Sequence, residues 1–280
     1  MLIEPLLSDD ELVADIDATD PGEGLALWWL GQSGFLIKHQ LGRILLDPYL
    51  SDSLTKKYAG SDKPHVPMTR RAVSPSLLRR ICLVTSSHNH TDHLDAETLL
   101  PLISANPGIT LVIPEANREF VCSRLSVAWD WPVGLNDGEI TEVHGIQIRA
   151  VPAAHNSLDR DSQGRCLYLG YVLQIGQHTI YHSGDTLRYP NMAELLRPFA
   201  IDIALLPING NRPERRVAGN LLGDEAAQLA HDCGAKLVIP CHFEMFEFNT
   251  ETPELFIKTC ERLKQPKRLL QCGQKILFPD

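Results

Sequence analysis

The stretch TSSHNHTDHLD, Thr85–Asp95, contains three histidines and two aspartates, residue types that bind metal ions. His88 and His90 are one residue apart, so on an extended segment they project to the same side and can share one ion. Asp92 and His93 follow where the chain turns and can face a second ion. Imidazole and carboxylate suit zinc, manganese or iron at a catalytic site. Capping and solvation of a loop would explain one such side chain, but not the whole set.

The elements that must position this loop are visible in the apolar runs around it. ICLVTS, directly before the histidines, is a short run of the kind that forms a buried strand. From Leu25 to Leu50, further apolar runs separated by GQSG and HQLG predict strands joined by turns, a β-meander. LVIPEANREFV and GEITEVHGIQIRAVPAAH continue the alternation of strands with turns and helices. Each time, a strand carries a polar cluster at its C-terminal end.

The last third of the chain repeats this arrangement. LYLGYVLQIGQHTIYHSGDT predicts a hairpin that turns near Gly176 and runs into Asp185, and IDIALLPING predicts a strand that runs into Asn209. Apolar residues at helical spacing predict a helix that ends at Gly234, and the strand KLVIP then leads to His242. The pattern therefore predicts an α/β sandwich, with two sheets and helices outside them.

Residues 51–76, SDSLTKKYAGSDKPHVPMTRRAVSPS, interrupt this pattern. Their content of proline, serine and lysine is unfavourable for regular structure, and the segment is longer than most connectors between elements. Long segments of this kind in a compact domain are often functional. Whether this one forms a lid over a site stays open.

The composition limits the class of protein. With 280 residues, 44% of them hydrophobic, the chain can bury a full core, and we expect a single domain over residues 1–280. The formal charge of -9 disfavours nucleic acid as a partner, so we expect a small-molecule substrate. The acidic N-terminus and the lack of a long apolar run predict a cytoplasmic protein that does not associate with membranes. Seven cysteines without a CxxC pair argue against a disulfide framework, and formation of a homo-oligomer stays open.

The motif HNHTDH resembles the His-x-His-x-Asp-His signature of the metallo-β-lactamase fold superfamily, and AAH, SGDT and PCHF follow in that superfamily's order. From WLGQSGFLI onward, the resemblance implies an αββα four-layer sandwich of two mixed β-sheets with outer helices. It also implies a site for two divalent metal ions, which would be zinc, manganese or iron. The implied ligands are His88, His90 and His155 for the first ion, Asp92, His93 and His242 for the second, and Asp185 as the bridge between them.

Within this superfamily, WLGQSGFLI, YHSGDT, NGNRP and VIPCHF resemble the branch of L-ascorbate 6-phosphate lactonases and related metal-dependent hydrolases. The implied reaction is hydrolysis of a lactone or related ester of a small sugar acid, with or without a phosphate. Two cations can share a water and present hydroxide as the nucleophile, and Asp92 and Asp185 are the expected catalytic carboxylates. Two alternatives stay open: a phosphodiesterase of the same fold, and a non-catalytic metal-binding sensor or scaffold.

Residues beside the ligands have narrower expected roles. The resemblance places Asp47, at the end of RILLDP, beneath the histidine loop, where it can accept an imidazole N–H bond and orient a ligand. A guanidinium can bind two oxygens of a phosphate or carboxylate at once, so we expect substrate contacts after the later strands. The expected contacts are Arg188, Tyr189, Asn209 and Arg212. The histidines expected to be structural or at the surface are His39, His65, His144, His178 and His231.

Overall fold

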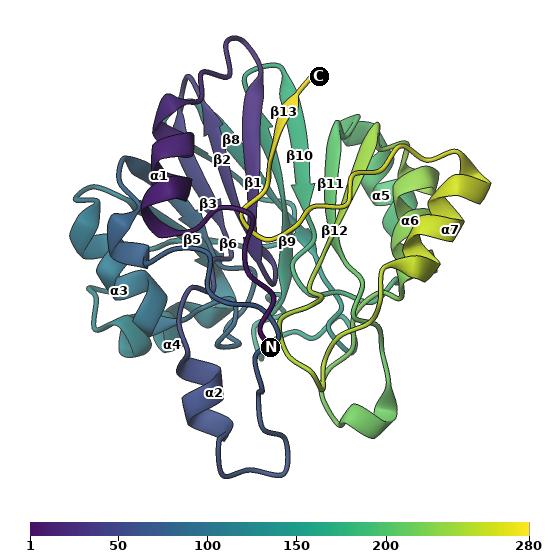
Figure 1. Cartoon of the computed structure of the whole chain (residues 1–280), viewed down its shortest axis with the longest axis horizontal. Coiled ribbons are helices and arrows are strands. Elements are labelled where there is room, and N and C mark those ends of the chain that lie inside the picture. The colour runs from purple at the N-terminus through teal and green to yellow at the C-terminus, as the bar shows by residue number, and fades with distance from the viewer. Residues whose placement is uncertain (280) are drawn as a thin grey trace.

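The structure, a computed structural model that describes residues 1–279, contains two mixed β-sheets packed face to face (Figure 1). The strand order is β13-β1-β2-β3-β4-β5-β6 in the first sheet and β12-β11-β10-β9-β8-β7 in the second. The strands of the first sheet are β1 (Leu25–Gly31), β2 (Gly34–His39), β3 (Gly42–Leu46), β4 (Ile81–Thr85), β5 (Thr110–Pro114), β6 (Val133–Leu135) and β13 (Lys275–Phe278). Those of the second are β7 (Ile140–Val143), β8 (Ile146–Pro152), β9 (Leu169–Ile175), β10 (His178–His182), β11 (Ile203–Pro207) and β12 (Leu237–Cys241).

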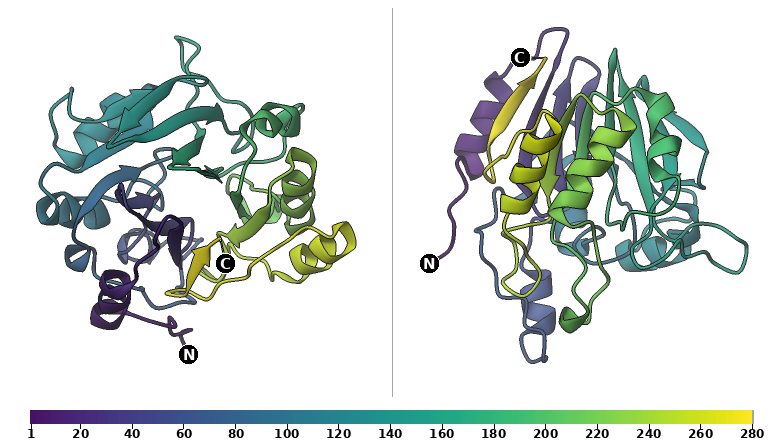
Figure 2. Two further views of the ribbon diagram at one scale, coloured as in Figure 1. Left: turned by 90° about the horizontal axis from the view of Figure 1, so that it is seen from above. Right: turned by 90° about the vertical axis from the view of Figure 1, so that its right-hand side faces the viewer.

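Helices cover the outer face of each sheet, so the molecule has four layers (Figure 2). Outside the first sheet lie α1 (Asp9–Ala18), α3 (Ala96–Ala105) and α4 (Arg118–Leu125), and outside the second lie α5 (Met192–Leu196), α6 (Gly223–Cys233) and α7 (Glu254–Leu263). The helix α2 (Ser53–Tyr58) projects beyond the sandwich at its lower end in Figure 1. The predicted αββα sandwich is therefore confirmed. No helix within residues 1–279 is long and apolar enough to cross a bilayer.

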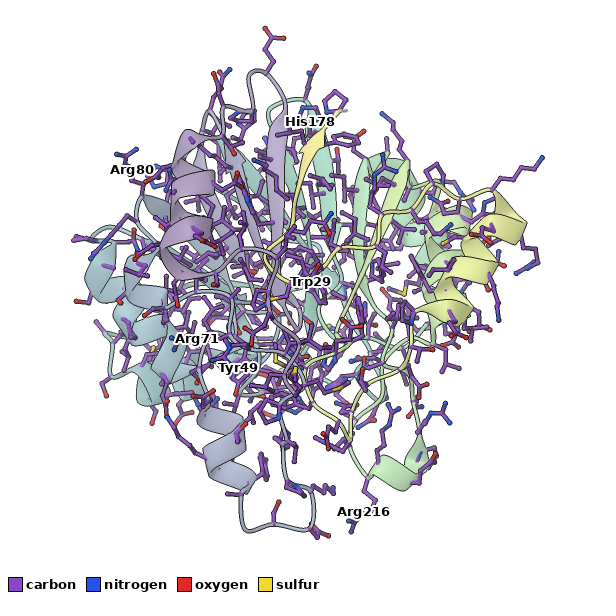
Figure 3. The ribbon with its side chains drawn as sticks, in the orientation of Figure 1. Trp29, Tyr49, Arg71, Arg80, His178 and Arg216 are labelled. Atoms are coloured by element: carbon purple, nitrogen blue, oxygen red, sulfur yellow. The ribbon has the colours of Figure 1, made fainter. Side chains whose placement is uncertain are left out.

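The strand β1 shows why the sheets stack in this way. Successive side chains of a strand point to opposite faces, and LALWWL is apolar at every position. Leu27 and Trp29 belong to the core between the two sheets, whereas Trp28 and Leu30 belong to the core beneath α1, α3 and α4. Trp29 accordingly lies near the centre of the molecule in Figure 3. A strand that is apolar on both faces can only be a middle layer, which places helices on its far side.

Most of the predicted elements are present with small shifts in their ends. The strands β1, β2 and β3 form the antiparallel meander, and β9 and β10 form the hairpin around Gly176. The helix α6 ends at Gly234, whose φ of +77° is the left-handed conformation that glycine adopts easily. Residues 51–76 differ from the prediction because they include α2. Leu54 is buried in a small apolar cluster with residues distant in sequence, and this tertiary contact stabilises a helix that the local composition disfavours.

The functional motifs all follow strands that end at one edge of the sandwich. The strands β3 and β4 are parallel, as are β10, β11 and β12, and β8 runs in the same direction as β10 because both are antiparallel to β9. Asp47 follows β3, the histidine loop follows β4, and His155, Asp185 and His242 follow β8, β10 and β12. That edge is the lower one in Figure 1, from which α2 projects.

Candidate metal centre

The histidine loop is fixed between β4 and α3. Its turn is closed by backbone hydrogen bonds from the amides of His93 and Leu94 to the carbonyl of His90, at 3.1 and 2.8 Å. Asp95 then caps α3, since its side chain accepts a hydrogen bond from the amide of Glu97. The loop has a defined shape at both ends, which is what a set of convergent ligands requires.

The first group of candidate ligands consists of the imidazoles of His88, His90 and His155. One ring nitrogen from each lies within 4.8 Å of the others. The Nε2 atom of His155 lies 3.2 Å from Nδ1 of His90, and the ring centroids of His88 and His90 are 4.5 Å apart. Residues that follow β4 and β8, strands of different sheets, thus converge on one point.

The second group consists of Asp92, His93, Asp185 and His242. Its ligand atoms also lie within 4.8 Å of one another. His93 Nε2 is 3.2 Å from Asp185 Oδ1, and His242 Nε2 is 3.3 Å from Asp185 Oδ2 and 3.5 Å from Asp92 Oδ2. Asp185 also approaches the first group, because its Oδ2 lies 3.5 Å from His155 Nε2. The Asp185 carboxylate therefore stands between the two groups, in the position expected of a bridge.

The donor set fits metal ions in chemistry and in spacing. Ligand atoms 2.0–2.2 Å from a tetrahedral ion lie about 3.4 Å from each other, and the separations in the second group are 3.2–3.7 Å. Within the described part of the chain, three buried ligand atoms make no hydrogen bond of normal geometry: His88 Nε2, and His93 Nε2 and Asp185 Oδ1, which face each other as an ion pair at 3.2 Å. Buried polar atoms are rarely left unpaired, so these three are accounted for if they bind cations.

The imidazoles of the first group have lowered pKa values. Burial lowers the pKa of His88 well below its ordinary value, and the neighbouring His93 and His90 add to the effect. Burial also lowers the pKa of His155, to about 4, although Asp185 opposes the shift. The pKa of His90 is lowered for the same reason. At neutral pH these imidazoles are neutral, the form that donates an electron pair to a metal ion.

In the second group, by contrast, the pKa values of the imidazoles are raised. Burial would lower the pKa of His93, but the carboxylates of Asp185 and Asp92 outweigh it and hold that pKa well above its ordinary value. The same competition, again with Asp185 as the strongest carboxylate, raises the pKa of His242 to about 9. Burial would raise the pKa of the Asp185 carboxyl, yet His242 and His93 hold it well below its ordinary range. These groups stabilise one another as charged pairs, and a bound cation would replace the protons.

Neighbouring residues orient the imidazoles. His93 donates from Nδ1 to Asp47 Oδ2 at 2.7 Å, which leaves Nε2 directed at the second group. Asp47 is itself fully buried and accepts hydrogen bonds from Thr85 Oγ1 at 2.9 Å and from the amide of Ser87 at 3.1 Å. His155 likewise donates from Nδ1 to the carbonyl of Gly219, at 3.0 Å. The orienting contact expected of Asp47 is thus present.

Gln32, from the GQSG turn between β1 and β2, is a further neighbour of the second group. Its side-chain Nε2 donates to Asp92 Oδ2 at 2.8 Å and lies 3.1 Å from His242 Nε2. Its carbonyl accepts the amide of His242, at 2.9 Å. Gln32, Asp47 and His242 all have positive φ angles, of +48°, +37° and +58°, which non-glycine residues adopt infrequently. Sharp turns at three strand ends direct these side chains into the site.

A cavity of ≈ 600 Å³ opens over the two groups. Its floor includes His90, Asp92, His155, Asp185 and His242, so candidate ligands from both groups are accessible to a small molecule. The walls come from loops that are distant in sequence. They are formed by Leu54, Lys57, Tyr58, Lys63, His65, Asn89, Thr91, Phe120, Arg124, Asn156, Tyr168, Val217, Ala218, Phe248 and Asn249.

Residues 42–243 match the family described as the β-lactamase superfamily domain, a stretch that contains both ligand groups. The chain belongs to this superfamily. This superfamily member is 27% identical over 241 residues to the UPF0173 metal-dependent hydrolase of Methanosarcina mazei, with 85% of this chain and 91% of that one covered. It is 29% identical over 242 residues to the corresponding hydrolase of Archaeoglobus fulgidus, with 84% and 90% covered. It is thus a metal-dependent hydrolase of the metallo-β-lactamase superfamily.

Solved structures agree on the fold of this superfamily member. Igni18, a metallo hydrolase from Ignicoccus hospitalis, superposes with a TM-score of 0.64 at 20% identity, covering 90% of this chain and 97% of that one. The isothiocyanate hydrolase from Delia radicum gut bacteria superposes with a TM-score of 0.70 at 18% identity, covering 90% and 99%. At these identities the likeness concerns the fold alone.

The four residues expected to contact substrate do not line the cavity of this superfamily member. Arg188 is paired with Asp232, and Arg212 is paired with Glu251. The hydroxyl of Tyr189 donates to the carbonyl of Pro152 at 2.9 Å. Asn209 is fully buried and supports the wall from behind, because its side chain donates to that of Asn249 at 3.0 Å. Each of these side chains is already engaged with the protein.

Some residues of the site lie outside the sequence-based prediction. His65, expected to be structural, lines the cavity, where its ring stacks on Tyr58 with centroids 4.4 Å apart and meets Phe248 edge-on at 4.6 Å. Tyr168 lies beside the first group, with its ring centroid 5.2 Å from that of His88. Of the site residues that the prediction missed, Gln32 is the one with a signal in the sequence. In WLGQSGFLI it is a polar residue between two buried strands.

Proposed function

We propose that this superfamily member uses two divalent cations, zinc, manganese or iron, to hydrolyse a small-molecule ester, most simply a lactone of a sugar acid. One observation carries the proposal: two ligand groups, with Asp185 between them, place five of their seven side chains on the floor of one cavity. When two cations are bound, they supply a water of lowered pKa and polarise the substrate oxygen that gains negative charge. Asp92 and Asp185 hold the cations, and Asp47 keeps His93 in its binding orientation.

The cavity wall supports a reaction without a covalent intermediate on the protein. Among the described residues that line the cavity there is no serine or cysteine, the usual nucleophiles of ester hydrolysis. The seven cysteines are free thiols, and those of Cys166, Cys233, Cys241, Cys260 and Cys272 are buried. Burial raises the pKa of the Cys241 thiol well above its ordinary value, which keeps the thiol next to His242 protonated and unreactive.

The size and charge of the site favour a small substrate over a polymer. A volume of ≈ 600 Å³ is typical of sites for single small molecules. A chain with a formal charge of -9 repels a polyanion over most of its surface. The lactone, rather than another ester, follows from the resemblance of WLGQSGFLI and VIPCHF to the lactonase branch.

The test is metal analysis of the purified protein together with a hydrolysis panel of simple lactones, sugar lactone phosphates and phosphodiesters. We expect about two cations per chain and turnover of lactones, with the His90→Ala variant as the blank. Turnover of phosphodiesters alone would replace the proposal with a phosphodiesterase. Two bound cations without turnover of any compound would indicate a sensor or scaffold.

A further inference from the structure

The cavity contains positive charges that the metal centre does not use. Lys57 from α2, Lys63 from the loop after it and Arg124 from α4 all line the cavity. Within residues 1–279, Asp92 and Asp185 are the only carboxylates that line the cavity, and both belong to the second ligand group. Outside that group, every fully charged side chain that faces the cavity is therefore a cation.

These cations lack the carboxylate partners found elsewhere on the molecule. In the described part of the chain, no ion pair involves Lys57, Lys63 or Arg124, although 35 acidic residues are present for 26 basic ones. The contrast is sharpest within α2, since Lys56 is paired with Glu97 at 2.8 Å and faces away from the cavity. A cation left without a partner inside a cavity is available to a ligand.

The two lysines surround one part of the wall. The Lys57 ammonium lies 5.0 Å from the ring centroid of Tyr58, which stacks on His65. His65 donates from Nδ1 to the carbonyl of Lys63 at 3.1 Å, so both lysines lie beside the stacked rings of Tyr58 and His65. Arg124 is more restricted, because its Nη1 donates to the carbonyls of the histidine loop. Lys57 makes no hydrogen bond or ion pair within residues 1–279, and Lys63 uses one of its three N–H groups for the carbonyl of Arg216, so both keep donors for a ligand.

The position of this part of the wall relative to the metal centre sets the shape of the ligand. Lys57 and Lys63 line the same cavity as candidate ligands of both groups, so one small molecule can contact the lysines and the metal centre at once. Lys63 donates to the carbonyl of Arg216, and the Arg216 side chain is paired with Asp62 at 2.7 Å, so these contacts join the loop after α2 to the loop that carries Arg216. Figure 3 shows Arg216 below the sandwich.

We propose that Lys57 and Lys63, with the ring of His65 between them, form an anion subsite, so that the substrate carries a carboxylate or phosphate apart from the bond that is cleaved. This inference rests on the proposed function and names the substrate class of the same site. The anion faces α2 and the loop after it, while the ester lies over the ligand groups at the cavity floor. Lysine suits either anion, because an ammonium binds oxygens of both as a point charge.

The test compares three lactones with the same reacting bond: one neutral, one with a distant carboxylate and one with a distant phosphate. We expect Lys57→Met to lower the ratio of kcat/KM for an anionic lactone to that for the neutral one by about tenfold or more, mainly through KM, since a charge-assisted hydrogen bond is lost. Lys57→Met with Lys63→Met should lower it further. Lys56→Met is the matched control, because this neighbouring lysine lies outside the cavity.

The outcomes separate the two proposals. A larger loss for the phosphate form or for the carboxylate form identifies the natural anion, and both support the subsite. An unchanged ratio in the double variant overturns the subsite and leaves the hydrolase intact. If no lactone is cleaved at all, calorimetric titration of inorganic phosphate into metal-free protein decides the question. Binding at least about tenfold weaker in the double variant supports the subsite, and equal binding overturns it.

Discussion

The two ligand groups contain the same side chain, histidine, in opposite states. In the first group the pKa values of all three imidazoles are lowered, that of His155 to about 4. In the second group Asp92 and Asp185 raise the pKa of His242 to about 9 and that of His93 well above its ordinary value. Burial acts on all of them in the same direction, so the carboxylates make the difference.

This difference shows how one cavity floor can prepare two cation sites in two ways. At neutral pH the first group binds an ion without a free-energy cost of deprotonation, because its imidazoles are already neutral. The second group is held together without a metal by ion pairs, such as His242 with Asp185 at 3.3 Å, and a cation must replace the protons in them. Asp185 belongs to the second group but contacts His155, so it couples the two.

The largest expected effect is that of Asp185→Asn, which removes the charge common to both groups. We expect kcat/KM to fall on the order of 10³-fold or more, because the polar groups that stabilise the transition state lose their alignment. Both cations should also bind more weakly. Metal content by mass spectrometry and hydrolysis of the best lactone measure the two effects, and circular dichroism controls for folding. Loss of one cation only would show that Asp185 serves a single group.

The second prediction concerns pH and follows from the signs of the shifts. Between pH 6 and pH 8, the imidazoles of the first group are already neutral, so affinity for the first cation should change little. His242, with a pKa of about 9, is protonated over that range, and its neutral fraction rises tenfold with each pH unit. Affinity for the second cation should therefore rise at least roughly 100-fold from pH 6 to pH 8, because His93, whose pKa is also raised, must lose its proton as well. Titration against a competing chelator measures both affinities, and equal slopes would remove the distinction between the groups.

The ligand groups could be predicted from the sequence because each ligand follows a readable strand. ICLVTS and KLVIP are short apolar runs that correspond to β4 and β12. His88 and His242 follow these strands along the chain. Parallel strands within each sheet end at a common edge, which is enough to bring such residues together. The grouping into two sets came from the resemblance to the superfamily, and the distances agree with that grouping.

The cavity wall could not be predicted in this way. Lys57, Phe120, Tyr168 and Phe248 come from separate segments whose spacing has no common period, and only the tertiary fold brings them together. Arg212 looked equally suitable because it follows a strand that ends at the same edge. Its partner is Glu251, 39 positions later, and a long-range ion pair of this kind leaves no local pattern.

The third prediction tests whether the groups are separate in their supporting contacts. Asp47 accepts a hydrogen bond from His93, which belongs only to the second group. Asp47→Asn keeps the volume but removes the charge, and we expect affinity for the second cation to fall about 10- to 100-fold. The first cation should be retained. Thermal unfolding of the metal-free variant controls for damage to the buried network around Thr85 and Ser87, and equal weakening of both cations would contradict the prediction.

The smallest effect is expected for Gln32, which touches the second group through a neutral amide. Gln32→Ala removes the hydrogen bond to Asp92 Oδ2, yet Asp92 keeps its contact with His242, so we expect the second cation to bind at most about tenfold more weakly. The first cation should be unaffected. Chelator titration of each variant measures both affinities.

Gln32→Glu distinguishes two roles for this amide. The glutamate adds a negative charge that attracts cations but cannot donate to Asp92, so metal affinity and activity are expected to separate. If Gln32 positions Asp92, the glutamate variant binds the second cation at least as tightly as the parent protein but has a lower kcat, because the Asp92 carboxylate is repelled from its place. If the amide only fills space, Gln32→Glu keeps the parent kcat. Of the two supporting residues, only Asp47 would then distinguish the second group from the first.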